Sequence, residues 1–221
     1  MGILSHYFSP TDLTDIKEAV KEAENKTSGE IVPFFAEASH HYREWIWLGS
    51  FLGGAIGGLV LLAFDAADYR SWDYTSLDAI AFVWSGAFIG LVIPYFISRI
   101  RLFLVPYSSK SFFVNLKAKE AFLDEEVFRT GNRIGILIYI SLFEKIVRIL
   151  PDSGIASIVP QSDWDEAVQL IVKGMRSGKR KEGIVASILF CGELLVKYGI
   201  KIQKDDKNEI SDEIRDGGTQ L

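Results

Sequence analysis

Three carboxylates stand where the strands of a small sheet are expected to end. Glu30 opens an apolar segment typical of a strand, Glu144 lies in a turn between two apolar segments, and Asp152 belongs to a Pro-Asp-Ser-Gly turn. Hard cations such as Ca²⁺ and Mg²⁺ prefer oxygen ligands. If these turns converge, the three side chains form a metal site. The alternative is that Glu144 is a solvated hairpin tip and that Asp152 only forms a turn.

Other residue types that often carry chemistry lack the spacing that this chemistry needs. His40 and His41 are adjacent, so they would not share one face of a helix or strand. No cysteine or third histidine lies near them to complete a zinc site. The chain also has no Gly-x-Ser-x-Gly segment, no P-loop and no Gly-x-Gly-x-x-Gly segment. The sequence therefore gives no local signal for nucleophilic catalysis or nucleotide binding.

The composition narrows the class of protein. The 221 residues include 24 basic and 29 acidic side chains, for a formal net charge of −5. This balance argues against nucleic acid as a partner, because nucleic-acid binding needs a basic face. The single cysteine, Cys191, excludes an internal disulfide, and its apolar surroundings in the sequence predict a small buried side chain.

Two segments, Trp45–Phe64 and Ala79–Ser98, contain no charged residue, and each is 20 residues long. A helix of this length would extend about 30 Å, the thickness of the hydrocarbon core of a bilayer. The segments therefore predict two transmembrane helices with the lipid bilayer as their solvent, rather than two buried core helices. Neither contains the charged residue that an ion pathway usually needs, which indicates an anchor and not a transporter.

Charges beside the two segments predict their orientation. The connection, residues 65–78, carries four aspartates and one arginine, whereas the outer flanks carry Arg43, Arg99 and Arg101. An excess of Lys and Arg marks the cytoplasmic side. We therefore expect a multi-pass protein of the plasma membrane, the inner membrane in a bacterium, with both soluble parts in the cytoplasm.

Glycines recur every fourth residue in both apolar segments. Gly49, Gly53 and Gly57 share one helical face, as do Gly86 and Gly90. Such faces let two helix backbones approach closely. They would form either the contact between the two helices of one hairpin or a homodimer interface. We favour the contact within one hairpin, because the short connection already holds its helices together.

The remaining sequence predicts an α/β fold in which helices cover a small mixed sheet. The expected strands are Glu30–Ala36, Gly135–Ile140 and Ile146–Leu150, and the expected helices begin at Ser9-Pro10, Lys110, Ser162 and Arg180. Pro33 places the first strand at an edge or at a bulge. Residues 1–44 and 99–200 would form one soluble domain, divided by helices at 45–64 and 79–98. The charged tail, residues 201–221, would be disordered.

Several soluble segments resemble the TPM domain family. Thr27-Ser28-Gly29-Glu30-Ile31-Val32 resembles its opening strand, and residues 133–141 resemble its central strand. Residues 144–155 resemble the strand and turn that follow, and Gly183-Ile184 fits the start of the last helix. The similarity covers residues 9–38 and 110–199.

This resemblance implies an α/β/α sandwich, here interrupted by a two-helix transmembrane hairpin as in a bacterial membrane-protein branch of the family. Some members are linked to phosphatase activity or to divalent metal binding, and many have no known activity. We therefore expect a membrane-anchored module that binds or assists another membrane protein. The alternative is a phosphatase that depends on Ca²⁺ or Mg²⁺ and uses Glu30 and Asp152.

Overall fold

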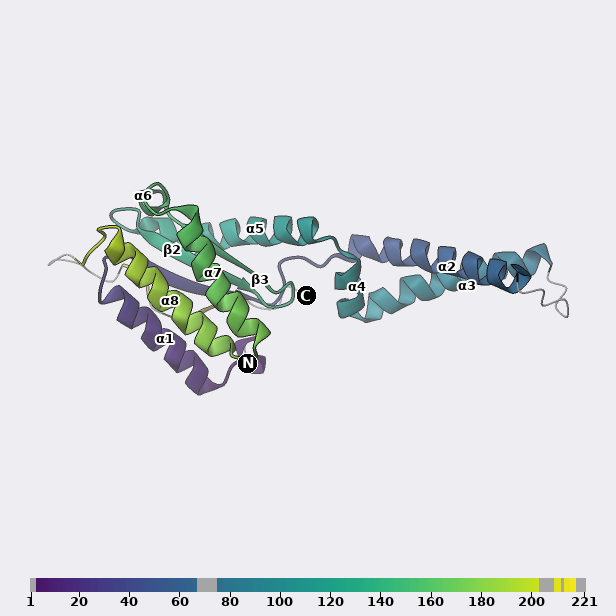
Figure 1. The fold of residues 1–221 in the computed structure, drawn as a ribbon, viewed down its shortest axis with the longest axis horizontal. Coiled ribbons are helices and arrows are strands. Elements are labelled where there is room, and N and C mark those ends of the chain that lie inside the picture. Colours follow the sequence, from purple (N-terminus) through teal and green to yellow (C-terminus); the bar gives the residue numbers. More distant parts are fainter. Residues whose placement is uncertain (1–2, 67–74, 203–208, 212, 218–221) are drawn as a thin grey trace. The chain divides into compact units, whose positions relative to one another are not determined.

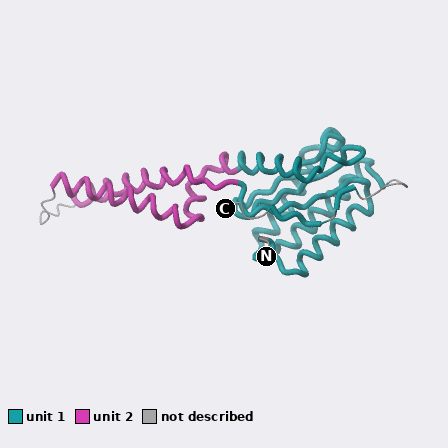
Figure 2. The backbone as a smooth tube through the Cα atoms, turned by 180° about the vertical axis from the view of Figure 1, so that it is seen from behind, with its two compact units in different colours: residues 1–39, 111–221 teal, residues 40–110 magenta. Residues whose placement is uncertain are grey.

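The computed structural model describes residues 3–66, 75–202, 209–211 and 213–217. These residues form two compact units (Figure 2). The first, here called the α/β unit, comprises residues 1–39 and 111–221, and the second, the hairpin unit, comprises residues 40–110. Most of the predicted connection between the apolar helices lies outside the described residues.

A four-stranded mixed sheet with the strand order β3-β2-β1-β4 forms the centre of the α/β unit (Figure 1). β1 (Glu30–Ala36) and β2 (Gly135–Ser141) are parallel and pair over their whole length. β3 (Ile146–Pro151) returns antiparallel to β2, and β4 (Arg215–Asp216) runs parallel to β1. The α/β class and the three predicted strands are thus confirmed.

The prediction that Pro33 places β1 at an edge was wrong, because β4 flanks β1 on the other side. The Phe35 carbonyl accepts a hydrogen bond from the Gly217 N–H at 2.9 Å, so the backbone groups of Phe35 point toward β4. Those of Pro33 point the same way, because backbone direction alternates along a strand. β4 pairs only with Phe34 and Phe35, so the missing N–H of Pro33 removes no hydrogen bond from the sheet.

The C-terminal tail is not disordered where the structure describes it. Arg215 and Asp216 form β4, and the Arg215 guanidinium contacts the Glu125 carboxylate at 2.6 Å. Farther back, the Glu209 carboxylate accepts the Gly131 N–H at 2.8 Å. A charged composition predicts solvation for such a tail, but strand pairing and ion pairs hold these residues to the α/β unit.

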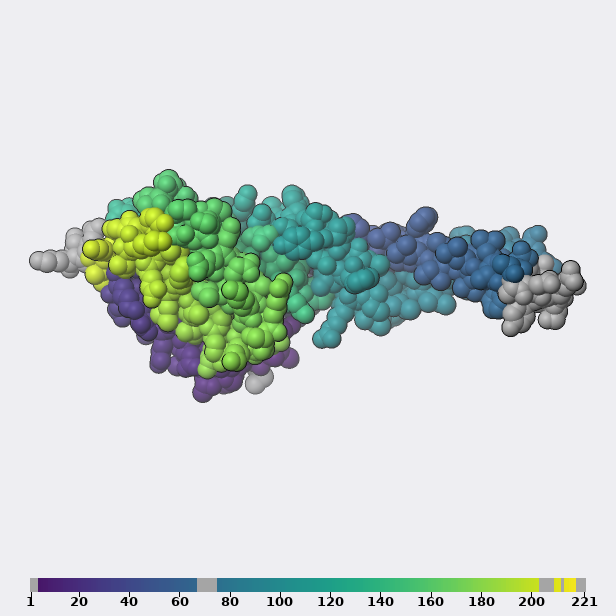
Figure 3. Space-filling view, in the orientation of Figure 1, coloured from purple at the N-terminus to yellow at the C-terminus, as the bar shows by residue number. Residues whose placement is uncertain are grey.

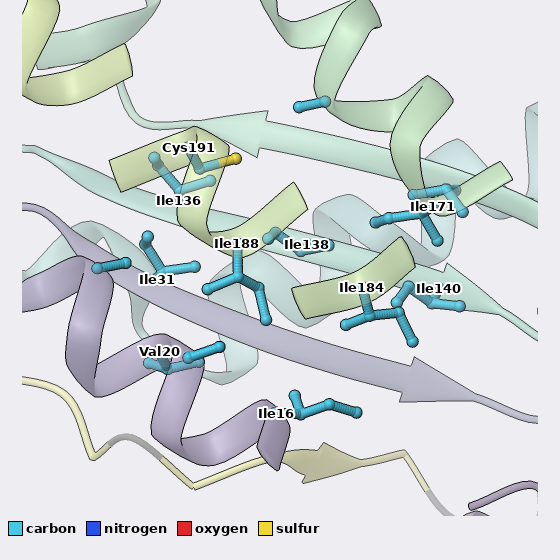
Figure 4. Close-up of a cluster of buried hydrophobic side chains, with 14 of the residues drawn as sticks. Ile16, Val20, Ile31, Ile136, Ile138, Ile140, Ile171, Ile184, Ile188 and Cys191 are labelled. Carbon is cyan, nitrogen blue, oxygen red and sulfur yellow. The ribbon is translucent and has the colours of Figure 1, made fainter. Parts of the chain in front are cut away.

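Helices α1 (Pro10–Glu24), α7 (Gln161–Arg176) and α8 (Arg180–Lys197) cover one face of the sheet (Figures 1 and 3). Their apolar side chains meet those of β1 and β2 in the larger core (Figure 4). The fully buried members of this core include Ile16, Val20, Ile136, Ile138, Ile140, Ile171, Ile184, Ile188 and Cys191. Cys191 is therefore the buried small side chain that its sequence context predicts.

Helix α5 (Tyr107–Asp124) supplies the smaller core on the opposite face. Val114, Ala118 and Ala121 pack with Leu137 and Tyr139 of β2. β2 can serve both cores because successive side chains of a strand point to opposite faces. Every residue of β2 is buried, which explains why its sequence is apolar instead of alternating.

Local signals account for most of the helix ends. Ser9 and Asp12 form the capping box that begins α1, and Gly199, with a φ of +88°, follows the end of α8. The Asp163 carboxylate does not cap α7, which begins at Gln161, and instead accepts hydrogen bonds from Lys197 and Tyr198. The short helices are η1 (Ile3–His6), η3 (Val127–Arg129) and α6 (Ser153–Ala156).

The hairpin unit consists mainly of two 21-residue helices, α2 (Ile46–Ala66) and α3 (Ser76–Phe96). Both are long and apolar enough to cross a membrane. The short η2 (Arg43–Trp45) precedes α2, and α4 (Ser98–Leu104) follows α3. Pro94 lies in the last turn of α3, which ends two residues later.

Candidate functional site

The glycine faces bring α2 and α3 into direct backbone contact. A Cβ atom added at Gly53 would fall on the Gly86 carbonyl oxygen, and one added at Gly90 would fall on that of Gly49. The Ser50 hydroxyl also donates a hydrogen bond to the Ala87 carbonyl at 3.0 Å. The predicted contact within one hairpin is therefore present, and it explains the four-residue spacing of the glycines.

The outer surfaces of the two helices are apolar and exposed. Only 6% of the most apolar window of each helix is buried. Large side chains such as Phe51, Trp84 and Phe88 are each more than two-thirds exposed. These helices therefore differ from the core helices of a soluble protein, because nothing in the described chain covers them.

Glu144 is a buried residue at the turn between β2 and β3, not a solvated hairpin tip. Its carboxylate accepts the Ser39 N–H at 2.8 Å and a hydrogen bond from the Ser141 hydroxyl. The Ser39 hydroxyl donates to Ser141 at 3.2 Å and lies 3.1 Å from the Tyr139 hydroxyl. A chain of hydroxyl groups thus leads from Tyr139 to Glu144.

The surroundings of Tyr139 strongly favour its protonated form. Burial raises the pKa of Tyr139 to about 12, with smaller contributions from the Glu144 and Glu120 carboxylates, while the Ser39 hydrogen bond opposes the shift. A phenol with so high a pKa is a hydrogen-bond donor at neutral pH and not a base. This network can fix the β2–β3 turn to β1.

Glu30 and Asp152 lie at the opposite end of β2 from Glu144. Glu30 faces Gly135 across the β1–β2 pair and accepts the Glu209 N–H at 3.0 Å. Asp152 follows β3, accepts the Ser153 N–H at 2.6 Å and contacts the Arg133 guanidinium at 2.9 Å. The turn-forming role of Asp152 is confirmed, since it is the N-cap of α6.

The convergence of Glu30, Glu144 and Asp152 on one cation is not found. β2 separates Glu144 from the other two by its length, about 20 Å for seven residues. Among the described residues, no three side chains of histidine, cysteine, aspartate or glutamate form a group that could hold a metal ion. His40 instead contacts Glu44 at 3.2 Å, and His41 is exposed.

A small acidic pocket beside α5 was missed by sequence reasoning. Its volume is about 200 Å³. Its lining includes Glu120, Asp124, Glu125, Tyr139 and Asp216. Two of these carboxylates are neutralised: Glu120 contacts Lys117 at 2.8 Å, and Glu125 contacts Arg215. In the sequence, only the i, i+4 spacing of Glu120 and Asp124 indicated that two acidic side chains share a helical face. Asp216 could not be associated with them, because it comes from the tail.

An exposed apolar stripe on α5 was also missed. Phe112, Leu116 and Leu123, here called the α5 stripe, are each more than half exposed. Their spacing of four and seven residues places them on one face of the helix, while Val114, Ala118 and Ala121 are buried on the other. The helix therefore presents apolar groups in two directions, which explains why its sequence shows no single apolar face.

The comparisons with known proteins concern the fold. No family model matches the chain, and no curated protein matches it. Among solved structures, the chain resembles the NMR structure of the BA42 protein from the psychrophilic bacterium Bizionia argentinensis, with a TM-score of 0.59 and 20% identity over 96% of each chain. At this identity the likeness speaks for the fold alone. The chain thus has an α/β fold similar to that of BA42, and its function has to be argued from its own residues.

Proposed function

We propose that this protein is a multi-pass membrane protein whose TPM-like α/β unit binds or assists another membrane protein. The observation that carries the proposal is the exposed apolar surface of α2 and α3. In water such a surface would drive aggregation, whereas in a bilayer it needs no protein cover. The backbone of both helices is hydrogen-bonded internally, as a membrane span requires.

Charge supports an orientation with the α/β unit in the cytoplasm of a bacterial cell. Arg43 precedes α2, and Arg99 and Arg101 follow α3, whereas Asp65 and Asp78 lie toward the other end of the hairpin. Lys and Arg beside membrane spans mark the cytoplasmic side. Both connections from the hairpin to the α/β unit, before α2 and after α3, therefore leave from the basic end of the hairpin.

The α5 stripe supports a protein partner for the α/β unit. Three large apolar side chains on one exposed helical face form the kind of surface that an amphipathic helix or a groove of another protein covers. α5 directly follows α4 in the chain, so a partner that binds the stripe is expected to be near the membrane.

The membrane topology can be tested by labelling single cysteines in intact cells. Cys191 is fully buried and serves as a silent background. We expect a membrane-impermeant thiol reagent to label Ser76→Cys, at the start of α3, and to spare Ser108→Cys until the membrane is opened. Both positions are exposed. Labelling with the opposite preference would overturn the orientation, and extraction of the protein without detergent would overturn the membrane assignment.

The binding role can be tested by crosslinking and capture of the full chain from detergent-solubilised membranes. We expect a membrane-protein partner that is lost with Leu116→Ser and Leu123→Ser. Ile158→Ser is the control, since Ile158 is a comparably exposed apolar residue outside the stripe. Capture unaffected by the stripe variants would contradict the role of α5. Metal-dependent phosphoester hydrolysis by the full protein, abolished by Asp152→Ala, would favour the phosphatase alternative instead.

A further inference from the structure

Arg101 of α4 is buried, and no carboxylate of the described residues forms an ion pair with it. Its side chain is only 7% exposed, and its Nε has no hydrogen-bond partner among the described residues. Within the described part of the chain, its guanidinium donates a hydrogen bond from Nη2 to the Ser98 hydroxyl at 3.3 Å. A buried guanidinium normally has its donors satisfied by an acceptor, most often a carboxylate or a phosphate.

Two charged neighbours in the hairpin unit act on Arg101 in opposite directions, and the repulsion by Arg43 is larger than the attraction by Glu44. Arg43 and Glu44 of η2 both lie near enough to act on the guanidinium, and the Glu44 carboxylate also lies 3.2 Å from the His40 Nε2. Burial lowers the pKa of Arg101, and the charge of Arg43 lowers it further, whereas Glu44 raises it. An anion between the two arginines would relieve both the burial and the repulsion.

An apolar groove begins on the same short helix. It has a volume of about 690 Å³ and is lined by Ile100 and Leu104 of α4 and by residues of α2 and α3 from Gly49 to Val60 and from Ala81 to Pro94. The helix rises about 17 Å between Gly49 and Val60, close to half the hydrocarbon thickness of a bilayer, about 15 Å. The groove is therefore about as long as one extended acyl chain of a lipid.

We propose that this end of the hairpin binds an anionic phospholipid. Its phosphate lies against the guanidinium groups of Arg101 and Arg43, and one of its acyl chains lies in the groove. This assignment rests on the proposed membrane insertion. A phospholipid is favoured over a helix of a second copy, because a lipid brings a phosphate and a flexible apolar chain to the adjoining basic and apolar features. A soluble phosphate would satisfy the arginines but leave the groove empty.

The test is native mass spectrometry of the full-length protein in detergent, titrated with phosphatidylglycerol or with phosphatidylcholine of the same acyl chains. We expect one phosphatidylglycerol per protein, in preference to phosphatidylcholine. Arg101→Gln should weaken this binding roughly tenfold or more, the effect of losing a charge-assisted hydrogen bond. The control is Arg99→Gln, an exposed residue of the same helix and charge, for which the loss should stay below about fivefold.

Several results would overturn the proposal. Equal losses in Arg101→Gln and Arg99→Gln would indicate a diffuse basic surface, and inorganic phosphate that displaces the lipid at equal concentration would indicate a soluble anion. A dimer with its groove closed to lipid would indicate a second copy. If Arg101→Gln does not fold, the headgroup preference of the unaltered protein and Arg101→Lys, which keeps the charge but loses the planar fork, decide the matter. Membrane fractionation of each variant is measured separately, so that loss of membrane insertion is not mistaken for loss of lipid binding.

Discussion

Two glycine-to-alanine substitutions in α2 distinguish the effect of helix propensity on hairpin stability from the effect of packing between α2 and α3. Gly53 lies at the contact with α3, where an added Cβ would fall on the Gly86 carbonyl oxygen and lie 3.0 Å from the Gly90 Cα. Gly58 lies five residues further along α2, where an added Cβ would meet only a Val83 methyl group at 3.8 Å. We expect Gly53→Ala to weaken the contact between α2 and α3 and Gly58→Ala to leave it intact.

The magnitudes follow from two opposing terms. Replacing glycine by alanine inside a helix stabilises it by about 1 kcal/mol. At Gly53 the new methyl group meets backbone atoms, which cannot rotate away, so the helices must separate at a cost of about 1–3 kcal/mol. Further contacts are lost where the backbones move apart. The propensity gain is the same in both variants and cancels, so they should differ in hairpin stability by the packing cost of about 1–3 kcal/mol, with Gly58→Ala the more stable.

The assay is a titration with sodium dodecyl sulfate in mixed micelles, followed by energy transfer between probes on the two helices. Trp47→Cys and Tyr95→Cys suit the probes, because both positions are exposed and lie at the end of the hairpin away from the connection. Cys191 is buried and should not react while the α/β unit is folded. Equal midpoints for Gly53→Ala and Gly58→Ala would refute the backbone contact between α2 and α3.

Three further predictions concern the α/β unit. Burial raises the pKa of Cys191 to about 12, so this thiol should resist alkylation in the native protein and react only after denaturation; rapid native labelling would contradict the core packing. Tyr139 should ionise near pH 12 in a phenolate absorbance titration. Its contribution to stability should be complete below about pH 10 and fall as the pH rises toward about 12, because the unfolded chain loses the proton first. Glu144→Ala should lower the free energy of unfolding by about 2–3 kcal/mol in chemical denaturation, because it leaves the Ser39 N–H without its acceptor. Glu120→Ala is the exposed control, and an equal loss there would refute the importance of the buried network.

Much of the fold could be predicted because its signals are local. The limits of β1, the β2–β3 hairpin and the Ser9 cap depend on residues that are neighbours in sequence. The interior position of β1 in the sheet could not be predicted. Its neighbour β4 comes from residues 215–216, in a tail whose composition resembles a solvated segment. The α5 stripe was hidden for a similar reason, since only the sheet decides which apolar side chains of a helix are covered.

The candidate metal site shows the same division. The sequence places Glu30 at the start of a strand and Glu144 and Asp152 in turns, and all three positions are found in the structure. Only strand direction decides which ends meet, and β3 runs antiparallel to β2, so Asp152 and Glu144 lie at opposite ends of the hairpin. The bonds of Glu144 to Ser39 and of Asp152 to Arg133 depend on that arrangement, which no spacing in the sequence reveals.

By itself the sequence determined that two 20-residue uncharged segments would be helical, that their glycines would share one face and that an α/β fold would accompany them, because composition and periodicity act along the chain. The tertiary structure decided which glycines meet, which carboxylates are neutralised and that Arg101 is buried without an ion pair to any carboxylate of the described residues. These properties depend on distances between segments remote in sequence, and such distances are set by packing and not by spacing.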